Sequence, residues 1–276
     1  MNDAEAEDTP EGAAEGGPRG PAPLFYSRPE VIEAARHGSV RLAPHDGYGF
    51  AAEATAIPLN VAEFAKAAVT YPIVFAGREA LSPVVVTGLR RGQNLFVGPD
   101  GAWEPLAYVP AYARRHPFIL TRPDPKREQV MLCLDMASPR VTEAKEGRAL
   151  FDQAGAPSEF ARNALDFCLT FQRQAMATEA VTGALREAGV LQAQRGEIAL
   201  EGGESLRLTD FHVIDEAALT ALSDEAWLTL RRTGAAAAAY CQLVSMNNWQ
   251  ALSRRVEARG PAGADDAGPR RSAAEG

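Results

Sequence analysis

The sequence predicts an α+β protein, with a strand-rich N-terminal half that contains hairpins and a helical C-terminal half packed on it. Two observations lead to this fold class. The first half contains compact apolar runs rich in β-branched residues, such as PIVFAG and SPVVVTGL, which are typical of buried strands. The second half repeats apolar residues at three- and four-residue steps after Ser158, which indicates a long helix with one apolar side.

Both ends of the chain lack core-forming side chains. Residues 1–22 are rich in Ala, Gly, Pro and Glu, and residues 258–276 have the same character. Such segments bury too little apolar surface to offset the entropy of ordering, so we expect disordered tails. The folded body then spans residues 23–257, as one domain or as two lobes of about residues 23–155 and 156–257. A chain of 276 residues with 46% hydrophobic content can bury a sizeable core.

The first half is expected to contain several strands and one short helix. The expected helix covers residues 61–68, and NLFVGPDGAWEPL predicts a β-hairpin because Pro and Gly turn residues separate two apolar runs. We expect Phe96 and Trp103 of this hairpin to be buried. The expected strands are SVRLAP, YGFAAEA, PIVFAG, SPVVVTGL and REQVMLCLDM, the last with Val130, Leu132 and Leu134 on one face.

The second half is expected to begin with a long helix. Ser158 can cap its N-terminus, and Gly189 can end it after Ala188. Its apolar stripe is expected to consist of Phe160, Ala164, Phe167, Phe171, Ala175 and Met176.

After this helix the sequence predicts a small hairpin and three more helices. EIALEGGESLRL predicts the hairpin, and FHVID predicts a further strand. Asp215 and Ser223 can cap two helices, of which the second ends at Gly234. The last helix, AAAAAYCQLVSMNNWQALSRRV, is expected to pack through Leu243, Met246, Trp249 and Leu252.

Charge and cysteine content limit the classes of function. The net charge of −8 and the pI of about 5.2 disfavour nucleic acid or an anionic membrane as a general ligand, because both require a basic surface. No N-terminal export signal and no run long enough to span a bilayer are present in the sequence. The odd number of well-separated cysteines, Cys133, Cys168 and Cys241, fits reduced thiols, so we expect a cytoplasmic protein.

Sequence motifs for cofactors and metals are weak. GYGFAA matches a dinucleotide-binding pattern, but a strand before it and a helix directly after it are not predicted. Asp210, His212 and Asp215 are close in sequence, and we prefer a surface strand followed by a helix cap to a metal site. His45 and Asp46 would point to opposite faces of a strand.

The segment YVPAYARRHPFIL combines apolar residues with three adjacent basic side chains. The structural interpretation is a short helix that begins at Pro110 and ends before Pro117. Arg114, Arg115 and His116 would then lie in its last turn, where positive charge complements the helix dipole. The residues favour this interpretation.

The functional interpretation of the same segment is an anion site. Guanidinium groups beside tyrosine hydroxyls can hold a carboxylate or phosphate. The candidate ligand-binding residues are Tyr108, Tyr112, Arg114, Arg115 and His116.

The chain resembles the SapC family of bacterial proteins. NLFVGPDGAWEPLAYVPAYARRHPFIL is similar to the central signature of that family, and YPIVFAG, LFDQAGAPSEF and the segment from DFHVIDEAAL to SMNNWQAL resemble its other elements in order. The resemblance covers roughly residues 24–256. Three positions depart from the family pattern: His116 stands where tyrosine is common, Thr209 where glycine is usual, and Gln242 where histidine often follows the tyrosine of the last helix. The last departure argues against a metal or acid–base role at position 242.

The resemblance implies an accessory role in a bacterial modification or uptake system. The family is labelled as related to surface layers or peptide transport, and similar proteins are commonly encoded beside flavin-dependent tryptophan-halogenase-like proteins, cupin-like proteins and outer-membrane receptors. We therefore expect a non-catalytic protein, without a cofactor, that recognises a peptide or protein partner, with a halogenase-like or cupin-like protein as a candidate. The alternative is an enzyme whose site is assembled around residues 108–116.

Overall fold

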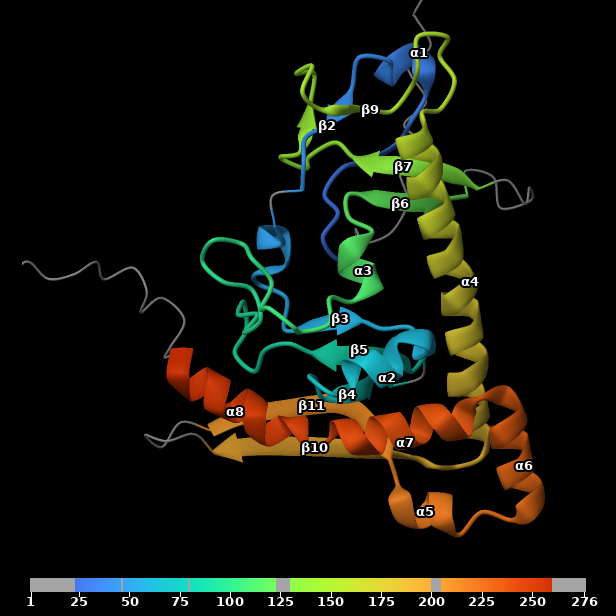
Figure 1. Cartoon of the computed structure of the whole chain (residues 1–276). Helices are drawn as coiled ribbons and strands as arrows, with labels where there is room; N and C mark the ends of the chain where they lie inside the picture. The colour runs from blue at the N-terminus through green and yellow to red at the C-terminus, as the bar shows by residue number, and fades with distance from the viewer. Residues whose placement is uncertain (1–22, 46, 79, 123–129, 200–204, 260–276) are drawn as a thin grey trace, which may run out of the picture.

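The fold is α+β, with a long helix beside two groups of strands. The computed structural model describes residues 23–45, 47–78, 80–122, 130–199 and 205–259. The expected tail over residues 1–22 lies outside the described residues, as do residues 260–276 of the other tail. Figure 1 shows the long helix α4 (Glu159–Glu187) beside small sheets at its N-terminal half and a larger sheet at its C-terminal half.

The larger sheet has five antiparallel strands in the order β10-β11-β4-β5-β3. Its central pairs are rich in β-branched residues, with Ile73 opposite Val85 and Val74 opposite Val84, and these four side chains are buried. Segments far apart in sequence therefore share one sheet. The strands are β3 (Ala56–Pro58), β4 (Ile73–Ala76), β5 (Ser82–Val86), β10 (Leu191–Ala199) and β11 (Ser205–Ile214).

The two smaller sheets each have three strands, in the orders β1-β7-β6 and β8-β2-β9. A second apolar cluster lies between them and α4 and includes Leu42, Phe118, Leu134 and Leu150. This cluster is separate from the main core on the larger sheet. The strands are β1 (Pro29–Val31), β2 (Arg41–Leu42), β6 (Phe118–Thr121), β7 (Met131–Asp135), β8 (Val141–Thr142) and β9 (Arg148–Ala149).

Helix α4 connects the two clusters. The Ser158 hydroxyl accepts a hydrogen bond from the Ala161 amide, which caps the N-terminus as predicted, and Gly189 follows the helix with a φ of 69°. The predicted stripe is wrong at Met176, whose side chain is 65% exposed. Because α4 packs against different elements along its length, its buried side changes direction. The buried residues are Ala161, Cys168, Thr178, Val181, Thr182 and Leu185.

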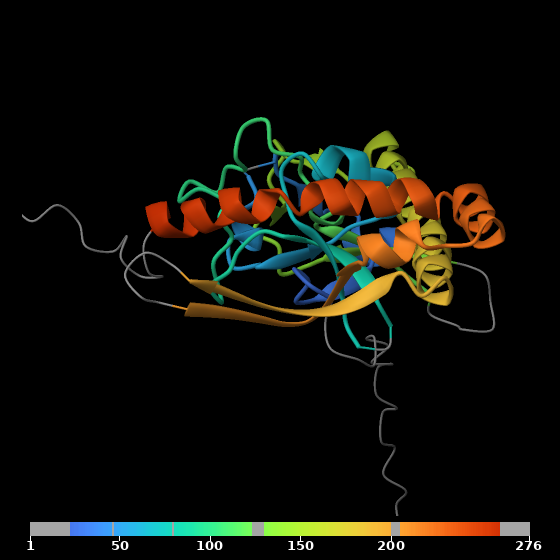
Figure 2. The ribbon, with the colours of Figure 1, turned by 90° about the horizontal axis from the view of Figure 1, so that it is seen from below.

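The remaining helices are shorter and are mostly those predicted. Asp215 and Ser223 cap α5 and α6 with their side chains, and Gly234 ends α6 in a left-handed conformation. Seen from below (Figure 2), α7 and α8 lie across one face of the β10–β11 hairpin. The helices are α1 (Ala34–His37), η1 (Gly49–Ala51), η2 (Val61–Glu63), α2 (Phe64–Ala67), α3 (Ala111–Arg114), α5 (Glu216–Thr220), α6 (Asp224–Thr233), α7 (Ala235–Ser245) and α8 (Asn248–Arg259).

Several predicted elements differ from the structure. YGFAAEA contains the short helix η1 instead of a strand, because its amides bond locally, as from Ala51 to the Tyr48 carbonyl. FHVID is part of β11 and not a separate strand. The predicted last helix is two helices, α7 and α8, separated at residues 246–247, and α8 continues through the predicted tail residues 258 and 259.

The predicted hairpin in NLFVGPDGAWEPL is reduced to one bridge between Val97 and Trp103. The turn itself forms, with the Gly98 amide donating to the Ala102 carbonyl at 2.8 Å. Phe96 and Trp103 are buried, as predicted. The indole of Trp103 donates to the Tyr71 hydroxyl at 2.9 Å, so burial does not leave its N–H group unpaired.

Candidate anion-binding site

The basic segment after α3 lies between the two parts of the molecule. Pro110 precedes α3, which ends at Arg114, and Arg115 is its C-cap residue. The chain then passes through a cis peptide bond between His116 and Pro117 and enters β6 at Phe118. This path confirms the predicted short helix, but of the three basic residues only Arg114 lies in its last turn. All three line a cavity beside the first half of α4.

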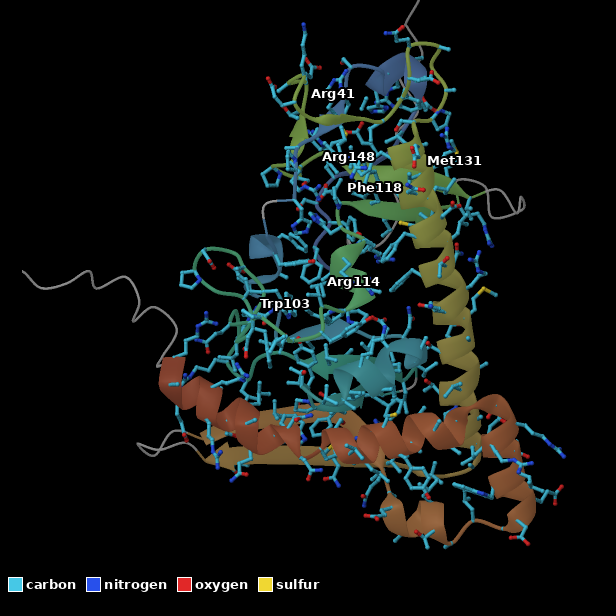
Figure 3. The ribbon with its side chains drawn as sticks, viewed as in Figure 1. Arg41, Trp103, Arg114, Phe118, Met131 and Arg148 are labelled. Atoms are coloured by element: carbon cyan, nitrogen blue, oxygen red, sulfur yellow. The ribbon has the colours of Figure 1, made fainter. Side chains whose placement is uncertain are left out.

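A cavity of about 290 Å³ lies between this segment and α4. Four arginines contribute to its wall, together with His116. Among the described residues, no aspartate or glutamate lines it. Figure 3 shows Arg148, Phe118 and Arg114 one below another beside α4. The full lining is Leu42, Arg114, Arg115, His116, Phe118, Arg140, Arg148, Phe160, Asn163, Ala164, Phe167 and Cys168.

Arg115 is fixed by aromatic rings. Its guanidinium carbon lies 4.1 Å from the centre of the Tyr112 ring and 4.4 Å from that of Phe171. Contacts of this kind attract a cation to the ring face. The Nε atom of Arg115 is buried and has no hydrogen-bond partner among the described residues, so the rings hold the group while it keeps hydrogen-bonding capacity.

Arg114 is held by backbone and by Tyr108. Its Nε donates to the Val109 carbonyl at 3.0 Å, and its Nη2 donates to the Tyr108 hydroxyl at 3.0 Å. Neither bond uses Nη1, which remains able to donate to a ligand. The guanidinium carbon also lies 5.4 Å from the centre of the Phe167 ring on α4.

Tyr108 links Arg114 to a buried carboxylate. Its hydroxyl donates to Glu63 Oε1 at 2.8 Å, and the same oxygen accepts from the Ala111 amide at 2.7 Å. Burial, together with the negative charge of Glu63, raises the pKa of Tyr108 to about 12. The hydroxyl is therefore protonated at neutral pH and acts as a positioning group between the two charges.

Arg140 and Arg148 complete the basic wall from the loop and strand after β7. Arg140 donates from Nε and Nη2 to the Ala43 carbonyl, at 3.3 and 3.0 Å. Arg148 is exposed, and its guanidinium carbon lies 4.2 Å from the centre of the Phe160 ring. It has no hydrogen bond or ion pair with any described residue, so its N–H groups are available to a ligand.

His116 is a buried, neutral member of the wall. Its ring centre lies 4.0 Å from that of Phe50, and its Nε2 lies 3.8 Å from Asp135 Oδ2, beyond hydrogen-bonding distance. Burial lowers the pKa of His116 from 6.5 to about 4, against the opposing effect of Asp135. Its Nδ1 is buried without a hydrogen-bond partner among the described residues, so the ring has unused hydrogen-bonding capacity.

The predicted site residues are only partly brought together. Arg114, Arg115 and His116 line the cavity. Tyr108 and Tyr112 do not line it; they contact Arg114 and Arg115, respectively. Sequence reasoning missed Arg140 and Arg148. These residues reach the site because β8 and β9 both pair with β2, and strands of two residues leave no periodic pattern in the sequence.

The other candidate sites do not assemble in the described part of the chain. Asp210 forms an ion pair with Arg78 at 2.9 Å, and Asp215 caps α5. No group of three or more potential metal-ligating side chains is present in the parts of the chain that the structure describes. Asp46 lies outside the described residues. Cys168 is buried, and burial raises its pKa to about 11, so it remains a thiol at neutral pH.

No helix within the described ranges is both long enough and apolar enough to span a bilayer. The SapC family model matches residues 32–252 of the chain. No match was found among curated proteins or among solved structures.

Proposed function

The chain belongs to the SapC family, and we propose that it is a non-catalytic accessory protein that binds an anionic group of a peptide or protein partner. The arginine-lined cavity beside α4 carries this proposal. Of the described residues, four arginines line it and no aspartate or glutamate does. Cations that share one cavity repel one another unless an anion offsets their charge, so this arrangement favours an anionic ligand.

The chemistry of the lining favours a carboxylate attached to an apolar group. Arginine can bind a carboxylate through two parallel hydrogen bonds. Phe118, Phe160 and Phe167 also line the cavity beside its arginines, which provides apolar surface for the group that carries the carboxylate. A cavity of about 290 Å³ is at the lower end of the range for small-ligand sites.

A binding role agrees better with the ionisable groups of the site than catalysis does. A general acid or base works best with a pKa near the working pH. At this site the pKa of His116 is lowered to about 4, and those of Tyr108 and Cys168 are raised to about 12 and 11. We therefore prefer binding to the alternative of an enzyme built around residues 108–116.

We place this role in the bacterial cytoplasm, as part of a modification or uptake system. The support is the family resemblance and the three free cysteines, of which Cys133 and Cys168 are buried, since reduced thiols suit a reducing compartment. A flavin-dependent halogenase-like or cupin-like protein remains the candidate partner. The partner would present its anionic group to the cavity.

The proposal is tested by the stability of the full chain in the presence of small anions. We would measure melting temperatures with N-acetylphenylalanine, with its uncharged amide, and with phosphate, all at matched ionic strength. A ligand that binds only the native state raises its melting temperature. We expect N-acetylphenylalanine to raise it and the amide to leave it unchanged. Equal effects of acid and amide, or no effect of any anion, would contradict the proposal.

A further inference from the structure

A second cavity adjoins the first on the other side of Arg115. It has a volume of about 240 Å³ and shares Arg115 and Cys168 with the first cavity. Within the described ranges it brings in one further arginine, Arg122, which follows β6 and is exposed. As in the first cavity, no aspartate or glutamate of the described residues is part of the lining.

The two cavities follow the same pair of elements in the same direction. Strand β6 contributes Phe118 to the first cavity and its next three residues to the second. Helix α4 contributes residues 160–168 to the first and residues 168–175 to the second. A ligand that occupies both would therefore lie along α4 and pass over Arg115.

We propose that the two cavities together bind an extended acidic peptide segment with at least two carboxylates. One carboxylate would lie in the first cavity beside Arg148, the other beside Arg122, with Arg115 between them. This inference rests on the proposed function, because it assigns the anion of the first cavity to a longer ligand. It adds that the partner is recognised through a linear acidic segment.

Charge and lining both favour an acidic peptide over another polyanion. Of the residues that the structure describes, five arginines line the two cavities, in a chain of net charge −8: Arg114, Arg115, Arg140 and Arg148 in the first, and Arg115 and Arg122 in the second. Ile119, Leu120 and Ala175 offer apolar surface for uncharged side chains between the carboxylates. Nucleic acid would need open ring faces for base stacking, and arginines already cover faces of Phe160 and Phe171.

The test uses the full chain and a series of labelled peptides in fluorescence anisotropy at fixed ionic strength. Each peptide is N-acetylated and C-amidated and carries two glutamates separated by a run of serines of increasing length. Matched peptides have either glutamate replaced by glutamine. At the best spacing, we expect the two-glutamate peptide to bind at least about tenfold more tightly than either single-glutamate peptide.

Two variants separate the two cavities. Arg122→Gln should abolish the gain from the second glutamate, whereas Arg148→Gln should also weaken the binding of N-acetylphenylalanine. Single-glutamate peptides could bind while no two-glutamate peptide binds more tightly, or Arg122→Gln could leave the extra affinity of the two-glutamate peptide unchanged. Either result would exclude the extended ligand and leave the proposed function standing. If neither the peptides nor N-acetylphenylalanine binds, the proposed function itself fails.

Two further results would overturn the choice of ligand. Tighter binding of a single-stranded oligonucleotide or of polyphosphate than of the best peptide would assign the cavities to phosphate groups. If the two-glutamate peptide bound more tightly only after removal of the acidic residues 1–22, the two cavities would be assigned to this chain's own N-terminal segment instead of a separate partner.

Discussion

The guanidinium carbon of Arg115 lies 4.1 Å from the centre of the Tyr112 ring, although the two residues are only three positions apart at the end of a helix of four residues. A third group, the Phe171 ring of α4, contacts the same guanidinium at 4.4 Å. Arg115 is thus both a wall of the cavity and a packing residue between α3 and α4.

This double role predicts that Arg115 and Tyr112 are energetically coupled. A cation–π contact of a partly desolvated arginine contributes about 1–2 kcal/mol, so a double-mutant cycle of Arg115→Gln and Tyr112→Leu should give a coupling of about 1 kcal/mol. The measurement is urea unfolding of the four proteins. Arg115→Lys, which keeps the charge but not the planar group, serves as a control and should recover only part of the stability. If the two single changes had additive effects on the free energy of unfolding, the contact between Arg115 and Tyr112 would contribute nothing to stability.

His116 predicts a specific loss of stability in acid. Its pKa is about 4 in the folded chain because of burial, against 6.5 in the unfolded chain. Between these values the unfolded state binds a proton that the folded state does not, so the stability that His116 contributes is present above pH 6.5 and falls as the pH drops toward 4.

The variant His116→Phe removes this titration and keeps a ring against Phe50. Between pH 7 and pH 4.5, we expect the free energy of unfolding to fall less in this variant than in the wild type, with a difference on the order of 1 kcal/mol or more. Urea unfolding at several pH values measures the difference, which cancels the effect of carboxylates common to both proteins. Parallel pH curves would mean that His116 is protonated without penalty in the folded state.

Gln242 predicts a large stability loss at a position far from the cavity. Strands β11 and β4 pair at only two residues, and beyond them the Gln242 side chain accepts from the Ile214 amide at 3.1 Å and donates to the Ile73 carbonyl at 3.0 Å. Gln242→Leu would leave both buried backbone groups without this partner, at a cost of about 2–5 kcal/mol.

The matched control for this change is Gln250→Leu, because Gln250 is an exposed glutamine on α8. We expect that variant to unfold within about 0.5 kcal/mol of the wild type. Chemical denaturation of both variants is the measurement. If Gln242→Leu were as stable as Gln250→Leu, the hydrogen bonds of the Gln242 amide to Ile214 and Ile73 would not stabilise the sheet.

Local chemistry made the helix ends predictable. Ser158, Asp215 and Ser223 each cap a helix with the side chain, as expected, because a cap depends on residues three positions away. The break between α7 and α8 was not predicted, since no proline or glycine lies between Ala235 and Arg259. Pairing of β4 with β11, more than a hundred residues later, left no signal in a single sequence.

The site was predictable to the extent that it is local. Arg114, Arg115 and His116 are consecutive and could be selected together, and Tyr108 and Tyr112 were found because they lie within a few residues. Their roles were not separable in the sequence, because it does not show which side chains face α4. Arg148 and Arg140 reach the cavity only through the tertiary pairing of β2 with β8 and β9.

The affinity of the full chain for N-acetylphenylalanine, compared between wild type and Arg148→Gln by isothermal titration at fixed ionic strength, tests the anion-binding cavity most directly. Arg148 is exposed and has no hydrogen bond or ion pair with a described residue, so its replacement should change the free energy of unfolding by no more than about 0.5 kcal/mol. The loss of a charge-assisted hydrogen bond should weaken binding about tenfold or more. Arg173→Gln, the same change at an exposed position of α4 outside the cavity, should stay within about twofold of the wild type. Wild-type affinity of Arg148→Gln, or an equal loss in Arg173→Gln, would contradict the account.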